Sequence, residues 1–87
     1  MNTNVSRMIR QERTRANLTQ RALARRAGLS PQYLNDVEHE RRTVTLETAE
    51  RIADALGMPR WRLVDAMLTD LVQGRYLVRV WPPATDG

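Results

Sequence analysis

The chain has 87 residues, of which 41% are hydrophobic and 28% charged, so we expect one folded domain. It contains no cysteine, which excludes disulfides, thiol nucleophiles and thiolate metal sites. No apolar run reaches the roughly 18 residues of a membrane span, and no N-terminal segment has the apolar length of a signal peptide. We therefore expect a small soluble protein with no membrane partner, and the lack of cysteine permits a reducing compartment.

The net charge of +4 is unevenly distributed along the chain. Residues 1–46 contain nine arginines and four acidic residues, a net charge of +5. Residues 47–87 contain five arginines and six acidic residues, a net charge of −1. This asymmetry indicates that the first half faces a polyanion and the second half another partner. All basic residues are arginine, which suits phosphate and guanine edges, although genome composition explains that usage equally well.

Apolar spacing and capping residues predict five short helices. In chain order they begin at residues 4 or 5, 20, 31, 46 and 59, and they end at about residues 16, 27, 40, 56 and 72 or 73. Thr19, Ser30 and Thr45 are the expected N-caps of the second, third and fourth helices, because their side chains can accept from free backbone N–H groups. Glu12 falls on the apolar stripe of the first helix and departs from the pattern.

The tail has a different pattern from the rest of the chain. Apolar residues with interleaved arginines predict a short strand over residues 75–81, ended by Pro82 and Pro83. A single strand in a helical chain leaves an unpaired edge, and the same strand of a second chain would satisfy it. The alternative is that the tail folds back on its own helices.

Residues 20–38, with the sequence QRALARRAGLSPQYLNDVE, predict two helices that cross at a steep angle. Ala24 is small where the helices cross, and Gly28 permits the left-handed turn between them. Leu34 and Val37 then form the inner face of the second of these helices. This pattern resembles the helix-turn-helix of the lambda-repressor and Cro-like family, also called the XRE family.

The resemblance extends over about residues 5–68. Arg13 stands seven residues before Gln20, Glu38 lies near the end of the recognition helix, and the fourth helix ends in Ala-Leu-Gly at residues 55–57, as in the family. The resemblance implies an all-α fold, a five-helix lambda-repressor-like DNA-binding domain with a short C-terminal β-strand used in dimerisation. The DNA-binding domain would be residues 1–73 and the dimerisation tail residues 74–87.

The outward face of the recognition helix, residues 31–40, is the expected reader of base edges. A turn of 3.6 residues places Gln32, Asn35 and Asp36 outward, and in the motif this face enters the major groove. The Gln32 amide matches adenine N6 and N7, while Asp36 would accept from cytosine N4 or reject other sites. The candidate base-contacting residues are Gln32, Tyr33, Asn35 and Asp36.

Phosphate contacts are expected from two helix N-termini and from the segment after the recognition helix. Free N–H groups and a positive dipole end favour phosphate at a helix N-terminus. The candidate residues are Thr19, Gln20, Arg21, Ser30, Arg41, Arg42 and Thr43. A solvated helix face is the favoured interpretation of Arg25 and Arg26, and a structural ion pair that of Arg13 with Glu38.

The last helix carries more apolar residues near its end than one small domain needs, and the predicted strand follows it. This predicts an isologous dimer interface, and Cro-like proteins dimerise through such a strand. The candidate interface residues are Met67, Leu68, Leu71, Val72, Tyr76, Leu77, Val78, Val80 and Trp81.

We find no nucleophile–base grouping, paired carboxylates, phosphate-binding glycine loop or metal-ligand set, so we expect no enzyme activity, cofactor or metal. The expected function is that of a homodimeric bacterial, plasmid or phage transcriptional repressor, which acts in the cytoplasm and binds an inverted repeat in double-stranded DNA. An activator, including a restriction–modification controller, stays open. So do an antitoxin whose tail binds a toxin and a protein-interaction module without DNA recognition.

Overall fold

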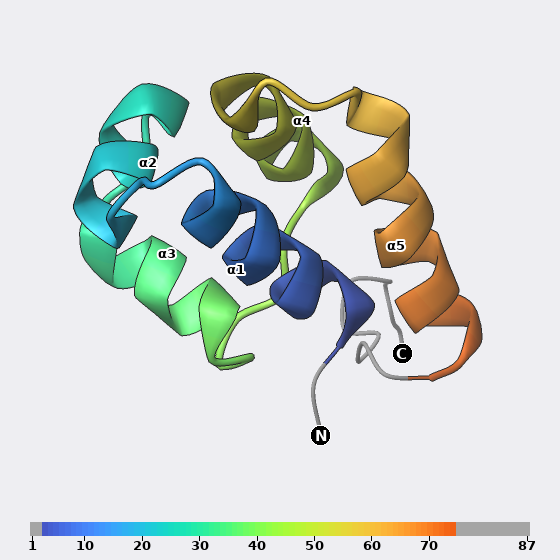
Figure 1. Cartoon of the computed structure of the whole chain (residues 1–87). Helices are drawn as coiled ribbons and strands as arrows, with labels where there is room; N and C mark the ends of the chain where they lie inside the picture. Colours follow the sequence, from blue (N-terminus) through green and yellow to red (C-terminus); the bar gives the residue numbers. More distant parts are fainter. Residues whose placement is uncertain (1–2, 75–87) are drawn as a thin grey trace.

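The computed structural model describes residues 3–74. This part of the chain is all-helical and holds five helices: α1 Asn4–Arg15, α2 Gln20–Ala27, α3 Pro31–Glu38, α4 Leu46–Leu56 and α5 Arg60–Val72. In Figure 1, α1 lies in the middle of the bundle, between the α2–α3 pair and α5, and α4 packs against both α2 and α5. The helical prediction is confirmed; the strand predicted over residues 75–81 lies outside the described residues.

The helix starts follow the capping pattern of the sequence. The hydroxyls of Thr19, Ser30 and Thr45 accept hydrogen bonds of 3.0–3.2 Å from backbone N–H groups in the first turns of α2, α3 and α4, as predicted. Thr3 caps α1 in the same way, which the sequence analysis missed. Gly28 ends α2 with a φ of +72°, the left-handed conformation that the turn to α3 requires.

Three predicted helix boundaries, at residues 16, 40 and 59, differ from the structure by one or two residues. Helix α3 ends at Glu38 rather than residue 40, because Glu40 adopts a φ of +62°. Two contacts hold Glu40 there: its Oε2 accepts from the Thr3 N–H at 2.6 Å, and the next N–H, of Arg41, donates to the Asp36 carbonyl at 2.7 Å. At the α5 start, Pro59 is the N-cap residue and not the first helical residue.

The core runs between all five helices. Its largest fully buried apolar side chains are Ile9, Leu23, Leu34, Ile52 and Leu63. Each of the five helices contributes one of these side chains, and removing their apolar surface from water drives the packing of the bundle.

Two acidic side chains connect α5 to α1. Asp70, fully buried on α5, accepts from the N–H groups of Asn4 and Val5 at 2.7 and 2.9 Å. A carboxylate at a helix N-terminus satisfies free donors and favours the positive end of the helix dipole. Glu12, the departure noted on the apolar stripe, lies at the edge of the core, 3.7 Å from the Arg62 guanidinium.

In the described part of the chain, no helix is long and apolar enough to cross a membrane.

Candidate nucleic-acid interface

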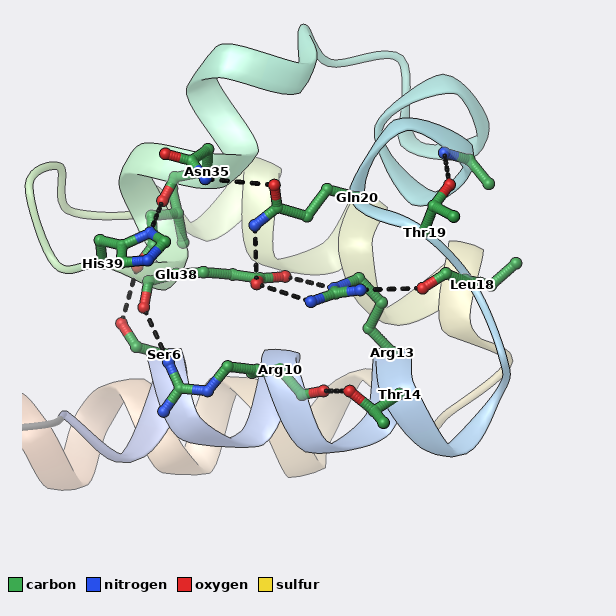
Figure 2. A network of polar contacts seen from close by, with 12 residues as sticks. Ser6, Arg10, Arg13, Thr14, Leu18, Thr19, Gln20, Asn35, Glu38 and His39 are labelled. Atoms are coloured by element: carbon green, nitrogen blue, oxygen red, sulfur yellow. Dashed lines mark hydrogen bonds and ion pairs between the residues drawn. The ribbon is translucent and has the colours of Figure 1, made fainter.

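A buried carboxylate, that of Glu38 at the end of α3, organises the helix-turn-helix (Figure 2). Glu38 is only 2% exposed. Arg13 of α1 donates to it twice, from Nε to Oε2 at 2.7 Å and from Nη2 to Oε1 at 3.0 Å. The ion pair expected from the sequence is therefore present with two hydrogen bonds. Arg13 Nη1 also donates to the Leu18 carbonyl at 2.9 Å, which holds the loop between α1 and α2.

A chain of two amides extends from Glu38 toward the outward side of α3 (Figure 2). Gln20, the first residue of α2, donates from Nε2 to Glu38 Oε1 at 3.0 Å. Its Oε1 in turn accepts from Asn35 Nδ2 at 3.1 Å. Both ends of the Gln20 amide thus serve to fix α3 against α2. From the sequence we expected Gln20 and Asn35 to contact DNA only, and their role in positioning α3 was not predicted.

Helix α1 holds the last carbonyl groups of α3, which have no partner within the helix. Ser6 Oγ donates to the Val37 carbonyl at 2.8 Å, and Arg10 Nη1 donates to the Glu38 carbonyl at 3.0 Å. The recognition helix is therefore fixed from behind by three side chains of α1, counting Arg13 (Figure 2). Sequence spacing gave no signal for Ser6 or Arg10, because their acceptors are backbone atoms far along the chain.

Of the predicted base-contacting residues on α3, Asn35 belongs to this network, and Gln32, Tyr33 and Asp36 lie outside it. Gln32 is exposed, and Tyr33, Asn35 and Asp36 are half-buried. The Tyr33 hydroxyl donates to the Thr43 carbonyl at 3.4 Å, which ties the segment after α3 to the helix. These four side chains thus lie on one short helix of eight residues.

The predicted phosphate-contacting residues lie at the ends of α2 and α3, and all except Gln20 are exposed. The exposed residues are Thr19, Arg21, Ser30, Arg41, Arg42 and Thr43. The first-turn N–H groups of a helix have no acceptor within it, so the two capped N-termini offer donors and a positive dipole end to an anion. The hydroxyls of Thr19 and Ser30 are already used as caps.

Arg25 and Arg26, near the end of α2, lie beside α4 and away from α3. Arg25 and Arg26 line an open groove of about 620 Å³ together with Arg51 and Asp54 of α4. The two carboxylate oxygens of Asp54 accept from Arg60 at 2.9 and 2.7 Å, and this hydrogen bonding holds the pKa of Asp54 below its ordinary value. The lining residues come from α2, its C-cap and α4, with none from α3.

The predicted dimer interface is described only in part. Met67 packs against the core. Leu68, Leu71 and Val72 are 53%, 44% and 85% exposed. The remaining predicted residues, Tyr76, Leu77, Val78, Val80 and Trp81, lie outside the described part of the chain.

Within residues 3–74, no group of three metal-ligating side chains lies together.

Two capped helices joined by a left-handed glycine turn, with the second helix fixed from behind and exposed in front, define a helix-turn-helix domain. A helix-turn-helix family model matches residues 9–60, more than half of the chain, and the protein belongs to this XRE-type family. No protein of curated function matches the chain in sequence.

Solved structures show the same fold. The wild-type restriction-modification controller protein C.Esp1396I is 23% identical over 80% of this chain and 90% of its own, with a TM-score of 0.68. The clp gene regulator ClgR from C. glutamicum is 25% identical over 79% of this chain and 90% of its own, also with a TM-score of 0.68. The chain thus has the fold of helix-turn-helix DNA-binding transcription regulators.

Replacing the central carboxylate tests whether it stabilises the fold. We expect Glu38→Gln to lower the free energy of unfolding by about 3 kcal/mol, because it leaves the Arg13 charge without its partner in a largely buried site. Glu47→Gln is the matched control: Glu47 pairs with Arg51 at 3.2 Å on the surface of α4, and its loss should cost less than about 1 kcal/mol. Urea denaturation of both variants measures the difference, and equal losses would contradict this role for Glu38.

Proposed function

We propose that this protein is a sequence-specific transcriptional repressor that binds an inverted repeat in double-stranded DNA as a homodimer. The observation that carries the proposal is the exposed face of α3 around Gln32, held against α2 by the Glu38 network. Membership of the helix-turn-helix family supports it, as does the net charge of +5 in residues 1–46. A helix presented in this way fits the major groove.

In this proposal the two kinds of contact come from different parts of the motif. Gln32 reads a base edge, since its amide donates and accepts as adenine N6 and N7 require. The N-termini of α2 and α3 and the arginines after α3 contact phosphates, which sets the register on the duplex. Repression follows from occupation of an operator that polymerase must cross.

The homodimer rests on the apolar end of α5. Leu68, Leu71 and Val72 are exposed there, directly before the tail that we assign to dimerisation, residues 74–87. Two copies related by a two-fold axis place their recognition helices in successive major grooves, about 34 Å apart. An inverted-repeat site is the DNA symmetry that matches such a dimer.

Selection from a pool of random duplexes at physiological salt tests the proposed function. We expect the protein to enrich two half-sites in inverted orientation, with centres about one helical turn apart. The readout is sequencing of the bound fraction, with the folded state of the protein verified by circular dichroism. Folded protein that enriches no sequence would contradict the proposal and favour a protein-interaction module.

Removing the Gln32 amide tests which residue reads the selected site. Gln32→Ala should relax preference at one base pair of each half-site by about 1–3 kcal/mol, because one bidentate contact is lost. Gln11→Ala, an exposed glutamine of α1, is the control and should leave base preference unchanged. Competition binding with single-base variants of the site is the measurement. An equal loss on all sequences would make Gln32 a backbone contact.

Shortening the chain tests the dimer. A protein that ends at Gln73 should sediment as a monomer and bind its site more weakly, because the tail is removed. In the full-length chain, Val72→Glu should also weaken the dimer, since it introduces a charge into the proposed interface. Leu46→Glu, at a 52% exposed leucine of α4, serves as the control. A dimer that survives both changes would exclude this interface.

A further inference from the structure

The carboxylate of Asp36, on the recognition helix, holds three side chains that the proposed function assigns to DNA. Its Oδ1 accepts from Gln32 Nε2 at 3.0 Å and from Arg41 Nη1 at 3.3 Å. Its Oδ2 lies 3.8 Å from Arg42 Nε. The Asp36 side chain therefore contacts Gln32, the candidate base-contacting residue, and both arginines that follow α3.

The ion pairs of Asp36 with Arg41 and Arg42 are exposed enough for other anions to replace the carboxylate. The side chains of Arg41 and Arg42 are each 61% exposed, whereas that of Asp36 is 17% exposed. Ion pairs at such exposure are weak, so a DNA phosphate can replace the carboxylate as partner of either arginine. In such an exchange the less exposed Asp36 side chain keeps its place on α3, and the more exposed side chains of Arg41 and Arg42 rotate toward the phosphates.

The backbone around the arginines is already held in place. The Tyr33 hydroxyl donates to the Thr43 carbonyl at 3.4 Å, and the Arg42 guanidinium lies 5.9 Å from the centre of the Tyr33 ring. The segment that carries Arg41 and Arg42 is thus attached to α3. Exchange between Asp36 and phosphate then requires only side-chain rotation.

We propose that Asp36 determines specificity by competing with DNA phosphates for Arg41 and Arg42 and by releasing them where its carboxylate can accept a hydrogen bond from cytosine N4. This inference rests on the proposed function. Guanine O6 and N7 and thymine O4 are acceptors that repel the carboxylate, and adenine places its N7 acceptor beside its N6 donor, whereas cytosine presents the N4 donor alone. On such sites Asp36 remains paired with the arginines, and phosphate binding by them is weakened. At a cytosine, the N4 amino group donates to the Asp36 carboxylate in place of Arg41 and Arg42.

The position of Asp36 defines where the cytosine lies. Gln32 and Asp36 are one helical turn apart on α3, and their side chains are joined by the 3.0 Å hydrogen bond. A cytosine contacted by Asp36 is therefore next to, or within a few base pairs of, the base read by Gln32. The selected site should contain both.

Asp36→Asn separates the two parts of the mechanism, because it removes the charge and keeps the shape. On random-sequence duplex, the plot of log affinity against log salt should steepen by about 1–2 units, since each arginine freed to neutralise a phosphate adds about 0.9. Its affinity there at physiological salt should rise about tenfold. In a repeated selection, the enriched base should change from cytosine to adenine, which an asparagine amide matches through N6 and N7.

Two further variants make the result unambiguous. Asp65→Asn makes the same chemical change at an exposed position of α5 and should leave base preference unchanged and the slope nearly so. Asp36→Ala, the second test of the same position, should steepen the slope equally and abolish preference at the cytosine. An unchanged slope on random duplex for both Asp36 variants, or weaker binding to every sequence, overturns the proposal.

The two proposals fail in different ways. Wild-type protein that is folded but enriches no sequence refutes the proposed function, and the cytosine contact fails with it. The slope on random duplex still decides whether Asp36 competes for the arginines, because non-specific binding needs no operator. An enriched operator with no preferred cytosine within a few base pairs of the Gln32 base refutes the role of Asp36 alone.

Discussion

The burial of the Glu38 carboxylate is the constraint on which the arrangement of the helix-turn-helix depends. A charge removed from water is stable only when opposite charge and hydrogen-bond donors surround it. Here Arg13 supplies the charge and two hydrogen bonds, and Gln20 supplies a third. The donors come from α1 and α2 and the acceptor from α3, so the three helices meet in one geometry. A displaced α3 would leave a buried carboxylate without its partners.

This constraint also explains how one short helix serves two purposes. The inner side of α3 uses Leu34, Val37 and Glu38, all nearly fully buried, to fix the helix in the bundle. The outer side carries exposed and half-buried polar groups, and its ion pairs with Arg41 and Arg42 are weak at this exposure. Buried interactions thus fix the helix, while its outer side remains available for the proposed DNA contacts. Asn35 lies between the two sides, since it donates to Gln20 and receives a 3.4 Å contact from Arg41.

Local sequence signals predicted the helices well, because a cap or a glycine turn depends on residues three or four positions apart. Thr19, Ser30 and Thr45 are examples. Contacts between distant residues were missed. Glu40 ends the recognition helix early through the Thr3 N–H, 37 residues away, and Ser6 and Arg10 bind backbone carbonyls that carry no sequence signature. The pairing of Arg13 with Glu38 was accessible only because the family pattern names both residues.

The central claim is that the outer face of α3 and the N-terminus of α2 meet DNA. An NMR titration of isotope-labelled protein with the selected duplex tests it most directly, since every backbone amide reports separately. We expect the largest shifts at Gln32, Asp36 and Arg42 and at the first turn of α2, with small shifts over the outer faces of α4 and α5. Shifts concentrated on the α2–α4 groove around Arg25 and Arg51, with α3 unaffected, would contradict it.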